Sequence, residues 1–145
     1  MKPLEGVQVL DLTRVLAGPT ATMILGDLGA SVIKVENPDQ GDETRTWGPP
    51  FQNGVSAYYL CANRNKRSIT LNLKHPGSRE ILQKLAQKSD VVTLNFPVGH
   101  LEKLQLTYED FKMINPKLIW ANISGFGLTG PRSLEPGYDI MIQGL

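Results

Sequence analysis

The chain has 145 residues, with 15 Lys and Arg against 14 Asp and Glu, a formal net charge of +1 and 41% hydrophobic residues. That length and apolar content suit one packed domain of ordinary size. The near balance of charge argues against proteins that bind nucleic acids or membrane surfaces, because those usually carry a charge excess over a whole domain.

The single cysteine and the lack of long apolar runs indicate in which cellular compartment the protein is expected. Cys61 cannot form an intrachain disulfide, and no Cys/His spacing resembles a zinc site, which favours a reducing compartment and predicts no metal. The residues before GVQVLDL leave no room for a signal peptide, and no apolar run reaches the roughly 18 residues of a membrane span. We expect a soluble cytoplasmic protein, or a protein of the mitochondrial matrix if a transit peptide has been removed. The apolar ending GYDIMIQGL suggests a piece of a longer chain.

The first part of the chain predicts a strand, a helix and a second strand. The apolar run Val7 to Leu12 and the β-branched run Ser31 to Glu36 are typical of strands. Between them, Pro19 suits the first turn of a helix, and Gly29 stands where a helix C-terminal cap belongs.

The same alternation recurs twice further along the chain. The apolar patterns predict, in order, a strand 69–73, a helix 76–88, a strand 91–95, a helix 107–114 and a strand 118–124. Thr107 and Asp110 have the spacing of a capping box at the start of the last helix. Because parallel neighbours need crossovers, this alternation predicts an α/β fold of Rossmann-like β-α-β units with a mainly parallel sheet.

Two stretches, 37–54 and 125–137, do not fit this alternation of strands and helices. The first is long enough for a functional or partner-binding loop. The second contains GFGLTG, which matches the G-x-G-x-x-G of dinucleotide-binding proteins, but Pro131 and Pro136 follow where that motif needs a helix. We favour a glycine-rich turn that lets two backbone segments pass closely, with a dinucleotide site as the alternative.

Polar and cationic residues follow the ends of several predicted strands. Because carboxyl ends of parallel strands share one edge of a sheet, these residues predict a ligand-binding rim. The alternative is a solvated edge with ordinary surface charges. The rim positions are Thr13, Arg14, Val15, Gly18, Asn37, Lys74, Asn95, Phe96, Ser124 and Gly125.

The remaining reactive side chains show no nucleophile motif. His75 and His100 lack a nearby acid or nucleophile in sequence, which favours surface or capping roles. Cys61 follows the run AYYL and is predicted to be a buried small hydrophobic residue. Tyr138 and Asp139 form a paired titratable site, although Asp139 also suits the N-cap of a helix that starts at Ile140.

Several segments together resemble the class III CoA-transferase family, which includes formyl-CoA transferase and is related to α-methylacyl-CoA racemase. The resemblance runs from about Leu4 to the last residue. TRTWGPPF and DLTRVLAGP are most similar to the branch that contains succinyl-CoA:glutarate CoA-transferase. The segments are VLDLTRVLAGP, LGDLGASVIKVENP, QGDETRTWGPPF, NRNKRSITLNLK, SDVVTLNFPVGHLEKL and ISGFGLTGPRSLEPGYD.

The resemblance implies that residues 1–145 are the N-terminal, CoA-binding α/β portion of the family's large domain. Its ligand is then coenzyme A or acyl-CoA, bound as a substrate. By position, Lys74 and Lys103 correspond to contacts with the CoA phosphates. The basic run Arg64, Lys66 and Arg67 contributes only to the local field. The residues that would line the CoA site are Val15, Leu71, Lys74, Asn95, Phe96 and Lys103.

The chain departs from the family pattern in three places. Asn37 and Lys103 stand where an Arg is common, which removes the bidentate fork of a guanidinium. The family's catalytic Asp is expected beyond Leu145, so the catalytic residue is unknown here and the isolated chain is expected to be inactive. Tyr138 and Asp139 are candidates only for supporting roles.

For the whole protein, the resemblance implies transfer of CoA from an acyl-CoA donor to a carboxylic acid, including dicarboxylic acids, through a carboxylate-linked covalent intermediate. The implied partners are acyl-CoA, the acid and a second copy in an interlocked homodimer, with no nucleic acid and no membrane. One alternative is an α-methylacyl-CoA racemase, which shuttles a proton with a His/Asp pair. Tyr138 stands at the His position and argues against it, because a phenol holds its proton at neutral pH. The other alternative is a catalytically inactive CoA-binding or dimerisation module.

Overall fold

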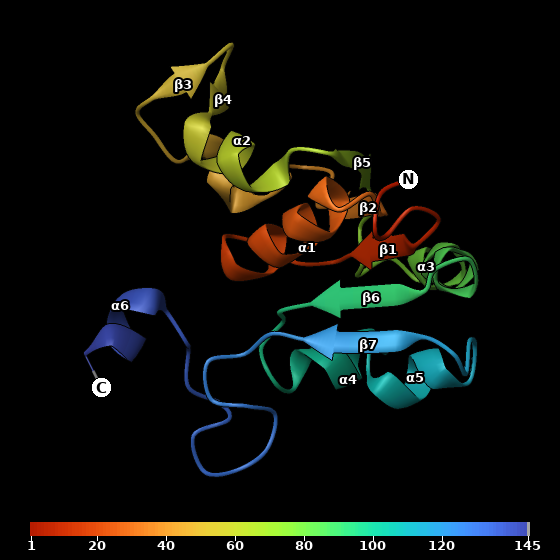
Figure 1. Cartoon of the computed structure of the whole chain (residues 1–145). Helices are drawn as coiled ribbons and strands as arrows, with labels where there is room; N and C mark the ends of the chain where they lie inside the picture. The colour runs from red at the N-terminus through yellow and green to blue at the C-terminus, as the bar shows by residue number, and fades with distance from the viewer. Residues whose placement is uncertain (145) are drawn as a thin grey trace.

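The computed structural model describes residues 1–144, which are organised around a five-stranded parallel sheet (Figure 1). All neighbouring strands of this sheet pair in parallel. The direction in which successive strands are added to the sheet reverses between β1 and β6, as in the Rossmann fold. This topology confirms the predicted α/β class. Across the sheet the strands are β5 (Lys66–Thr70), β2 (Ser31–Glu36), β1 (Gln8–Asp11), β6 (Val91–Leu94) and β7 (Ile119–Asn122).

Helices cover both faces of the sheet (Figure 1). Helix α1 (Ala17–Asp27) lies on one face, over a small core of Val9, Ala30 and Val32. The other face carries α3 (Ser78–Gln87), α4 (His100–Leu104) and α5 (Tyr108–Lys112). The larger core lies beneath these three helices, since side chains alternate between faces along each strand. Its buried members are Leu10, Leu12, Val35, Leu82, Ala86, Val92, Leu94, Leu101, Leu106, Phe111 and Leu118.

The predicted helix signals at α1 and α5 are confirmed. Gly29 follows α1 with a φ of +108°, a conformation that glycine adopts without strain. At α5, the Thr107 hydroxyl accepts a hydrogen bond from the Asp110 N–H at 3.3 Å, and the Asp110 carboxylate accepts one from the Thr107 N–H at 3.0 Å. This is the reciprocal pair of a capping box.

The predicted strand 69–73 is displaced, because β5 spans Lys66–Thr70. Its first residue is not a solvated cation. The Lys66 ammonium is buried and lies 3.1 Å from the Asp11 carboxylate. The strand therefore begins at a charged residue that the sequence pattern assigns to the preceding loop. The neighbouring cations are also used within the fold: Arg64 pairs with Asp27, and Arg67 donates to the Ser31 hydroxyl at 2.9 Å.

The predicted loop 37–54 and the residues after it hold short elements that the sequence pattern did not indicate. They are the 3₁₀ turn η1 (Glu43–Thr46), strands β3 (Phe51–Gln52) and β4 (Val55–Ser56), and α2 (Ala57–Asn63). The hairpin and α2 stand beyond α1 in Figure 1. The prediction that Cys61 is buried is wrong. Helix α2 buries Tyr59, Ala62 and Asn63, which leaves Cys61 on its outer side.

The glycine-rich stretch 125–137 is a close crossing of two backbone segments. A Cβ atom built on Gly125 would overlap the Cα of Gly137, and a Cβ on Gly137 would overlap Gly125. After Gly130, the next helix of the described residues begins at Asp139, so no helix N-terminus directly follows the third glycine. The geometry therefore agrees with the close-passage interpretation of GFGLTG rather than with a dinucleotide fingerprint.

Three ion pairs lie at the carboxyl ends of β1 and β2. Asp11 pairs with Lys66, Lys34 with Asp42 at 2.9 Å, and Glu36 with Arg45 at 2.7 Å. Burial lowers the pKa of Lys66, and the Asp11 charge opposes that shift. The sequence does not reveal these buried charges, because each partner lies on a different element.

The pKa of Glu36 makes stability depend on pH. Burial alone would raise it, but hydrogen bonds from Arg45, Ser68, the Asp42 N–H and Tyr59 hold it at about 2, below its ordinary 4.5. A carboxyl whose pKa is lowered on folding stabilises the protein above its unfolded pKa, and this contribution is lost as the pH falls through the folded value. We expect the difference in unfolding free energy between wild type and Glu36→Gln to shrink as the pH falls from about 4.5 to about 2.

Urea unfolding at a series of pH values measures this difference. The exposed Glu109→Gln variant is the matched control and should show little difference from wild type throughout. A Glu36→Gln difference that stays constant over that pH range would contradict the assignment.

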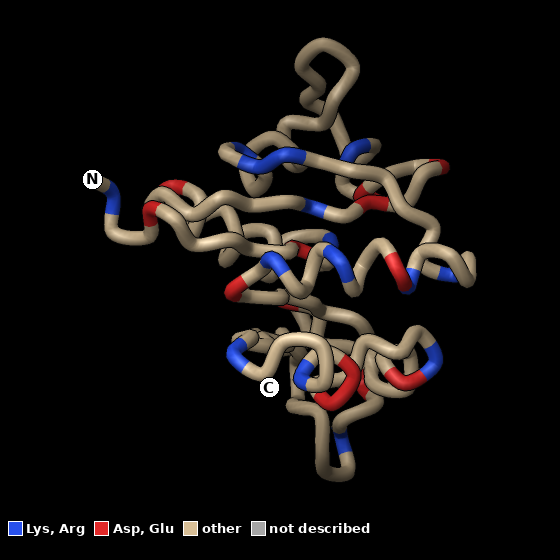
Figure 2. The backbone as a smooth tube through the Cα atoms, turned by 90° about the vertical axis from the view of Figure 1, so that its right-hand side faces the viewer, with Lys and Arg blue, Asp and Glu red and all other residues tan. Residues whose placement is uncertain are grey.

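The surface charges are mixed in sign. In Figure 2, basic and acidic positions are interspersed along the chain, with no single basic face in that view. Among residues 1–144, no helix is long and apolar enough to cross a membrane, and no group of three or more His, Cys, Asp or Glu side chains is placed to hold a metal ion.

Candidate functional site

The point where the strand order reverses lies between the ends of β1 and β6. In open α/β sheets, ligands bind in the crevice outside the carboxyl ends of the strands at this point. Here the segments that follow the two strands are joined through Asn95. Its Oδ1 accepts a hydrogen bond from the Arg14 N–H at 2.9 Å, and its Nδ2 donates to the Arg14 carbonyl at 2.7 Å. The Arg14 guanidinium also lies over the Phe96 ring, 5.3 Å from its centroid.

Val15 continues this segment in an unusual conformation. Its φ is +70°, in the left-handed region that a β-branched side chain rarely adopts. Its N–H donates to Oδ1 of the buried Asp42 at 3.3 Å. Burial alone would raise the pKa of Asp42, but the Lys34 charge and hydrogen bonds outweigh burial and lower it, so this carboxylate stays ionised near neutral pH.

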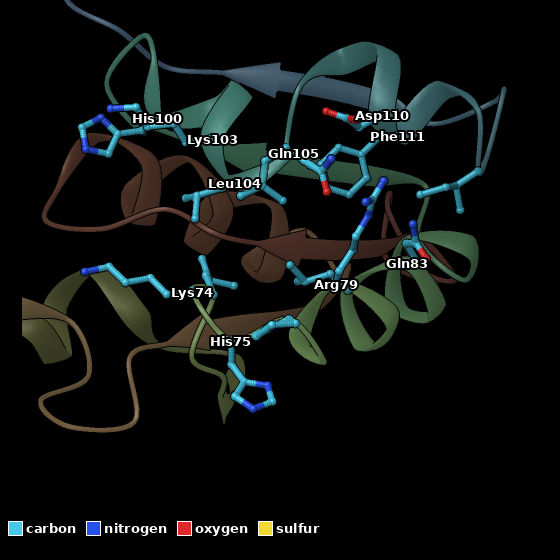
Figure 3. A pocket seen from close by; sticks show the side chains of 15 residues that line it. Lys74, His75, Arg79, Gln83, His100, Lys103, Leu104, Gln105, Asp110 and Phe111 are labelled. Atoms are coloured by element: carbon cyan, nitrogen blue, oxygen red, sulfur yellow. The ribbon is translucent and has the colours of Figure 1, made fainter.

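A cleft of about 620 Å³ opens beside this edge, between the segment that follows β5, the start of α3, and helices α4 and α5 (Figure 3). In Figure 3, Lys74 lies on one side of the cleft with His100 and Lys103 on the other, while Arg79 rises from α3 between the two walls. Apolar side chains from both walls form its floor. These are Leu73, Leu82, Leu104, Leu106, Phe111 and Ile114.

The charge of the cleft is positive. Lys74, Arg79 and Lys103 line it, and within residues 1–144 none of them has an ion-pair partner. Asp110 is its one acidic lining residue, and that carboxylate already accepts hydrogen bonds from Thr107 at 3.0 and 2.6 Å. Unpaired cations over an apolar floor suit a ligand with phosphates and a flat aromatic part.

The predicted CoA-site residues fall into two groups. Lys74 and Lys103 line the cleft, whereas Val15, Asn95 and Phe96 lie at the ends of β1 and β6. Leu71 belongs to neither group: it packs against the larger core, as Phe96 and Leu73 also do. Asn37 has an exposed side chain whose Oδ1 accepts the Asp39 N–H at 2.9 Å, so it adds no charge here.

Tyr138 and Asp139 do not line the cleft. Tyr138 is the N-cap residue of α6 (Asp139–Gln143), so the expectation that Asp139 is the N-cap is wrong by one position. Tyr138 is 64% exposed, and the Asp139 carboxylate accepts a hydrogen bond from Gln143 at 2.6 Å within the helix. Neither side chain is paired with another reactive group among the described residues.

Sequence reasoning missed Arg79 and His100 as cleft residues. Arg79 is in the first turn of α3, five residues after Lys74, and that placement was the available signal. His100 opens α4, a helix the sequence pattern did not indicate. His75 is exposed, which agrees with the surface role in the prediction of a surface or capping position; its Nδ1 accepts the Gly77 N–H at 3.1 Å in the turn before α3, and it also lines the cleft.

Comparison with known proteins gives the family of this fold and cleft. The model of CoA-transferase family III matches residues 4–145. The chain belongs to CoA-transferase family III. Succinyl-CoA:glutarate CoA-transferase of Mus musculus is 54% identical to this family III chain over 145 residues, which are 100% of the chain and 33% of that protein.

Two further comparisons agree. Acetyl-CoA:oxalate CoA-transferase of Acetobacter aceti is 48% identical over 143 residues, covering 99% of this family III chain and 36% of that protein. The crystal structure of a CAIB/BAIF family protein from Brucella suis superposes with a TM-score of 0.94 at 51% identity, covering 99% of this chain and 39% of that one. The family III chain thus spans about a third of the length of the curated relatives it matches.

Proposed function

We propose that the whole protein is a CoA-transferase and that the cleft between α3 and α4 binds the phosphates of coenzyme A. The observation that carries this proposal is the pair Lys74 and Lys103 in a family III chain, both unpaired in the described structure and both lining one apolar-floored cleft. Charge-assisted bonds from Lys or Arg to phosphate are among the stronger hydrogen bonds in proteins. The apolar floor gives the adenine a surface on which to pack.

The proposed substrates are an acyl-CoA donor and a carboxylic acid. Dicarboxylic acids are the acceptors that we propose to test first. Relatives at 54% and 57% identity are named as succinyl-CoA:glutarate CoA-transferases, which supports a dicarboxylate donor and acceptor. In the proposed chemistry, a carboxylate of the whole protein attacks the thioester carbonyl and displaces the CoA thiolate, which leaves a mixed anhydride. The thiolate then attacks the enzyme carbonyl of that anhydride, which releases the donor acid and leaves an enzyme-CoA thioester. The acceptor carboxylate takes the CoA by the reverse steps.

The expected oligomer and compartment also stay predictions. We propose an interlocked homodimer in the cytoplasm or mitochondrial matrix. Apolar side chains near the end of the chain are exposed among the described residues, where a second copy or further segments of the whole protein can cover them. They are Leu134, Tyr138, Ile140, Met141 and Ile142.

Incubation of the whole protein with succinyl-CoA and glutarate tests the reaction. We expect glutaryl-CoA and succinate to form, as measured by liquid chromatography. In heavy water with a 2-methylacyl-CoA, we expect no loss of the α-proton signal in the NMR spectrum. Exchange of that proton without CoA transfer would instead support a racemase, and CoA binding with neither reaction would support a binding module.

A further inference from the structure

The turn Thr13–Val15, which follows β1, is held by side chains from three separate parts of the fold. The Thr13 N–H donates to Asp11 at 2.9 Å, the Arg14 N–H to Asn95 at 2.9 Å and the Val15 N–H to Asp42 at 3.3 Å. Asp11 ends β1, Asn95 follows β6 and Asp42 follows β2. Three successive peptide N–H groups are therefore each bound by a different segment.

The carbonyl groups of the same turn are bound as well. The buried Lys34 ammonium donates to the Thr13 carbonyl at 2.7 Å, and Asn95 Nδ2 donates to the Arg14 carbonyl at 2.7 Å. A Cβ on Gly18 would overlap the Thr13 side chain, so α1 also packs directly against the turn. These contacts hold Val15 at a φ of +70°. A strained backbone conformation persists only where the surrounding structure fixes it by several interactions.

We propose that Asn95 is a positioning residue of the acyl-CoA site, which acts by holding the turn Thr13–Val15 in its binding conformation. Both ends of the Asn95 amide are occupied by the Arg14 main chain, one as acceptor and one as donor. These two bonds fix the Arg14 N–H and carbonyl together, so the Asn95 amide shapes the turn. The inference rests on the proposed function, because the turn lies where the strand order reverses and ligands of this fold bind.

The physical benefit is pre-organisation. A segment that is already ordered in the free protein does not lose further conformational freedom when the ligand binds, so less of the interaction energy is offset. If loss of the Asn95 bonds left the turn in its binding conformation only about a tenth of the time, the apparent Kd for acyl-CoA would rise about tenfold.

The test compares Asn95→Ala with Asp90→Ala in the whole protein. Asp90 is a matched control, because its carboxylate accepts the Gln8 N–H at 2.8 Å at the opposite end of the same strand β1. We expect similar midpoints of urea unfolding for the two variants. We expect Asn95→Ala alone to raise the Kd for succinyl-CoA about tenfold by titration calorimetry. Hydrogen exchange should become faster at the Arg14 and Val15 amides in Asn95→Ala, and at the Gln8 amide in Asp90→Ala.

Each other outcome overturns a stated part of the inference. Equal affinity in the two variants would remove Asn95 from the site. Lost affinity with unchanged exchange at Arg14 and Val15 would make Asn95 a direct ligand contact instead of a positioning residue. If wild type binds no acyl-CoA, the proposed function fails and the inference fails with it. If the wild type binds acyl-CoA and the two variants bind it with equal affinity, the inference fails and the proposed function stands.

Discussion

Replacing Asp42 by Ala is expected to lower the free energy of unfolding by about 3–5 kcal/mol, because it leaves the buried Lys34 charge without its partner. The two side chains are 1% and 0% exposed, and their charged atoms lie 2.9 Å apart. The same carboxylate also accepts hydrogen bonds from Val15 and from the Thr44 N–H and hydroxyl. Its loss therefore frees η1 and the turn after β1 together.

Two further variants show whether the unpaired charge causes the loss. Asp39→Ala makes the same change in the same loop at an exposed position, and its effect should stay within about 0.5 kcal/mol. The double variant Lys34→Met/Asp42→Leu removes both charges and should recover much of the stability, because apolar residues of similar size can replace a buried pair. Urea unfolding measures all three. Equal midpoints for Asp42→Ala and Asp39→Ala would show that the pair does not stabilise the fold.

Replacing Lys74 and Lys103 together by Ala is expected to weaken acyl-CoA binding by the whole protein about 100-fold or more. A hydrogen bond to a charged group contributes roughly 1.5–3 kcal/mol, which is about ten- to a hundred-fold in affinity for each lysine. Contacts with a phosphate remote from the thioester are equal in the ground and transition states. We therefore expect KM to rise with a much smaller change in kcat.

A matched double control separates the effect of lost total charge from the effect of the two positions in the cleft. Lys112→Ala/Lys117→Ala removes the same two charges from exposed positions that do not line the cleft. We expect this control to keep wild-type affinity for acyl-CoA, and both double variants to unfold at the wild-type urea concentration. The cleft assignment is wrong if the two double variants bind acyl-CoA equally.

Much of the fold follows from local sequence signals. The β-branched run Ser31 to Glu36 forms a strand with the predicted bounds, and the Thr107/Asp110 spacing forms the predicted capping box. Each signal is contained in a few neighbouring residues, which is why single-sequence reasoning captures it. The parallel order then follows from the alternation of helices and strands.

The errors share a different physical origin. The basic run around Lys66 is predicted to precede the strand, but the Lys66 ammonium is buried against the Asp11 carboxylate, 55 residues away in the sequence. That long-range pairing moves the start of β5 to Lys66. Helix α2 has no clear apolar periodicity because it buries Asn63, whose side chain bonds the Tyr59 carbonyl at 2.9 Å.

The candidate site was predicted in its parts but not in its arrangement. The family resemblance singled out Lys74 and Lys103, and the structure places both on one cleft. The resemblance did not reveal Arg79, which enters the same cleft from α3. Nor did it show that the Asn95 amide is committed to Arg14, because that contact joins segments 81 residues apart.

Hydrogen exchange with and without CoA tests the location of the ligand most directly. CoA added to the whole protein should slow exchange in the segments 71–79 and 95–105, which contain the cleft residues Lys74 and Lys103, and in the turn Thr13–Val15. The Lys74→Ala/Lys103→Ala variant should lose that protection at the same CoA concentration. Protection confined to the glycine-rich stretch 125–137, with none around the cleft, would contradict this location and favour the dinucleotide interpretation of GFGLTG.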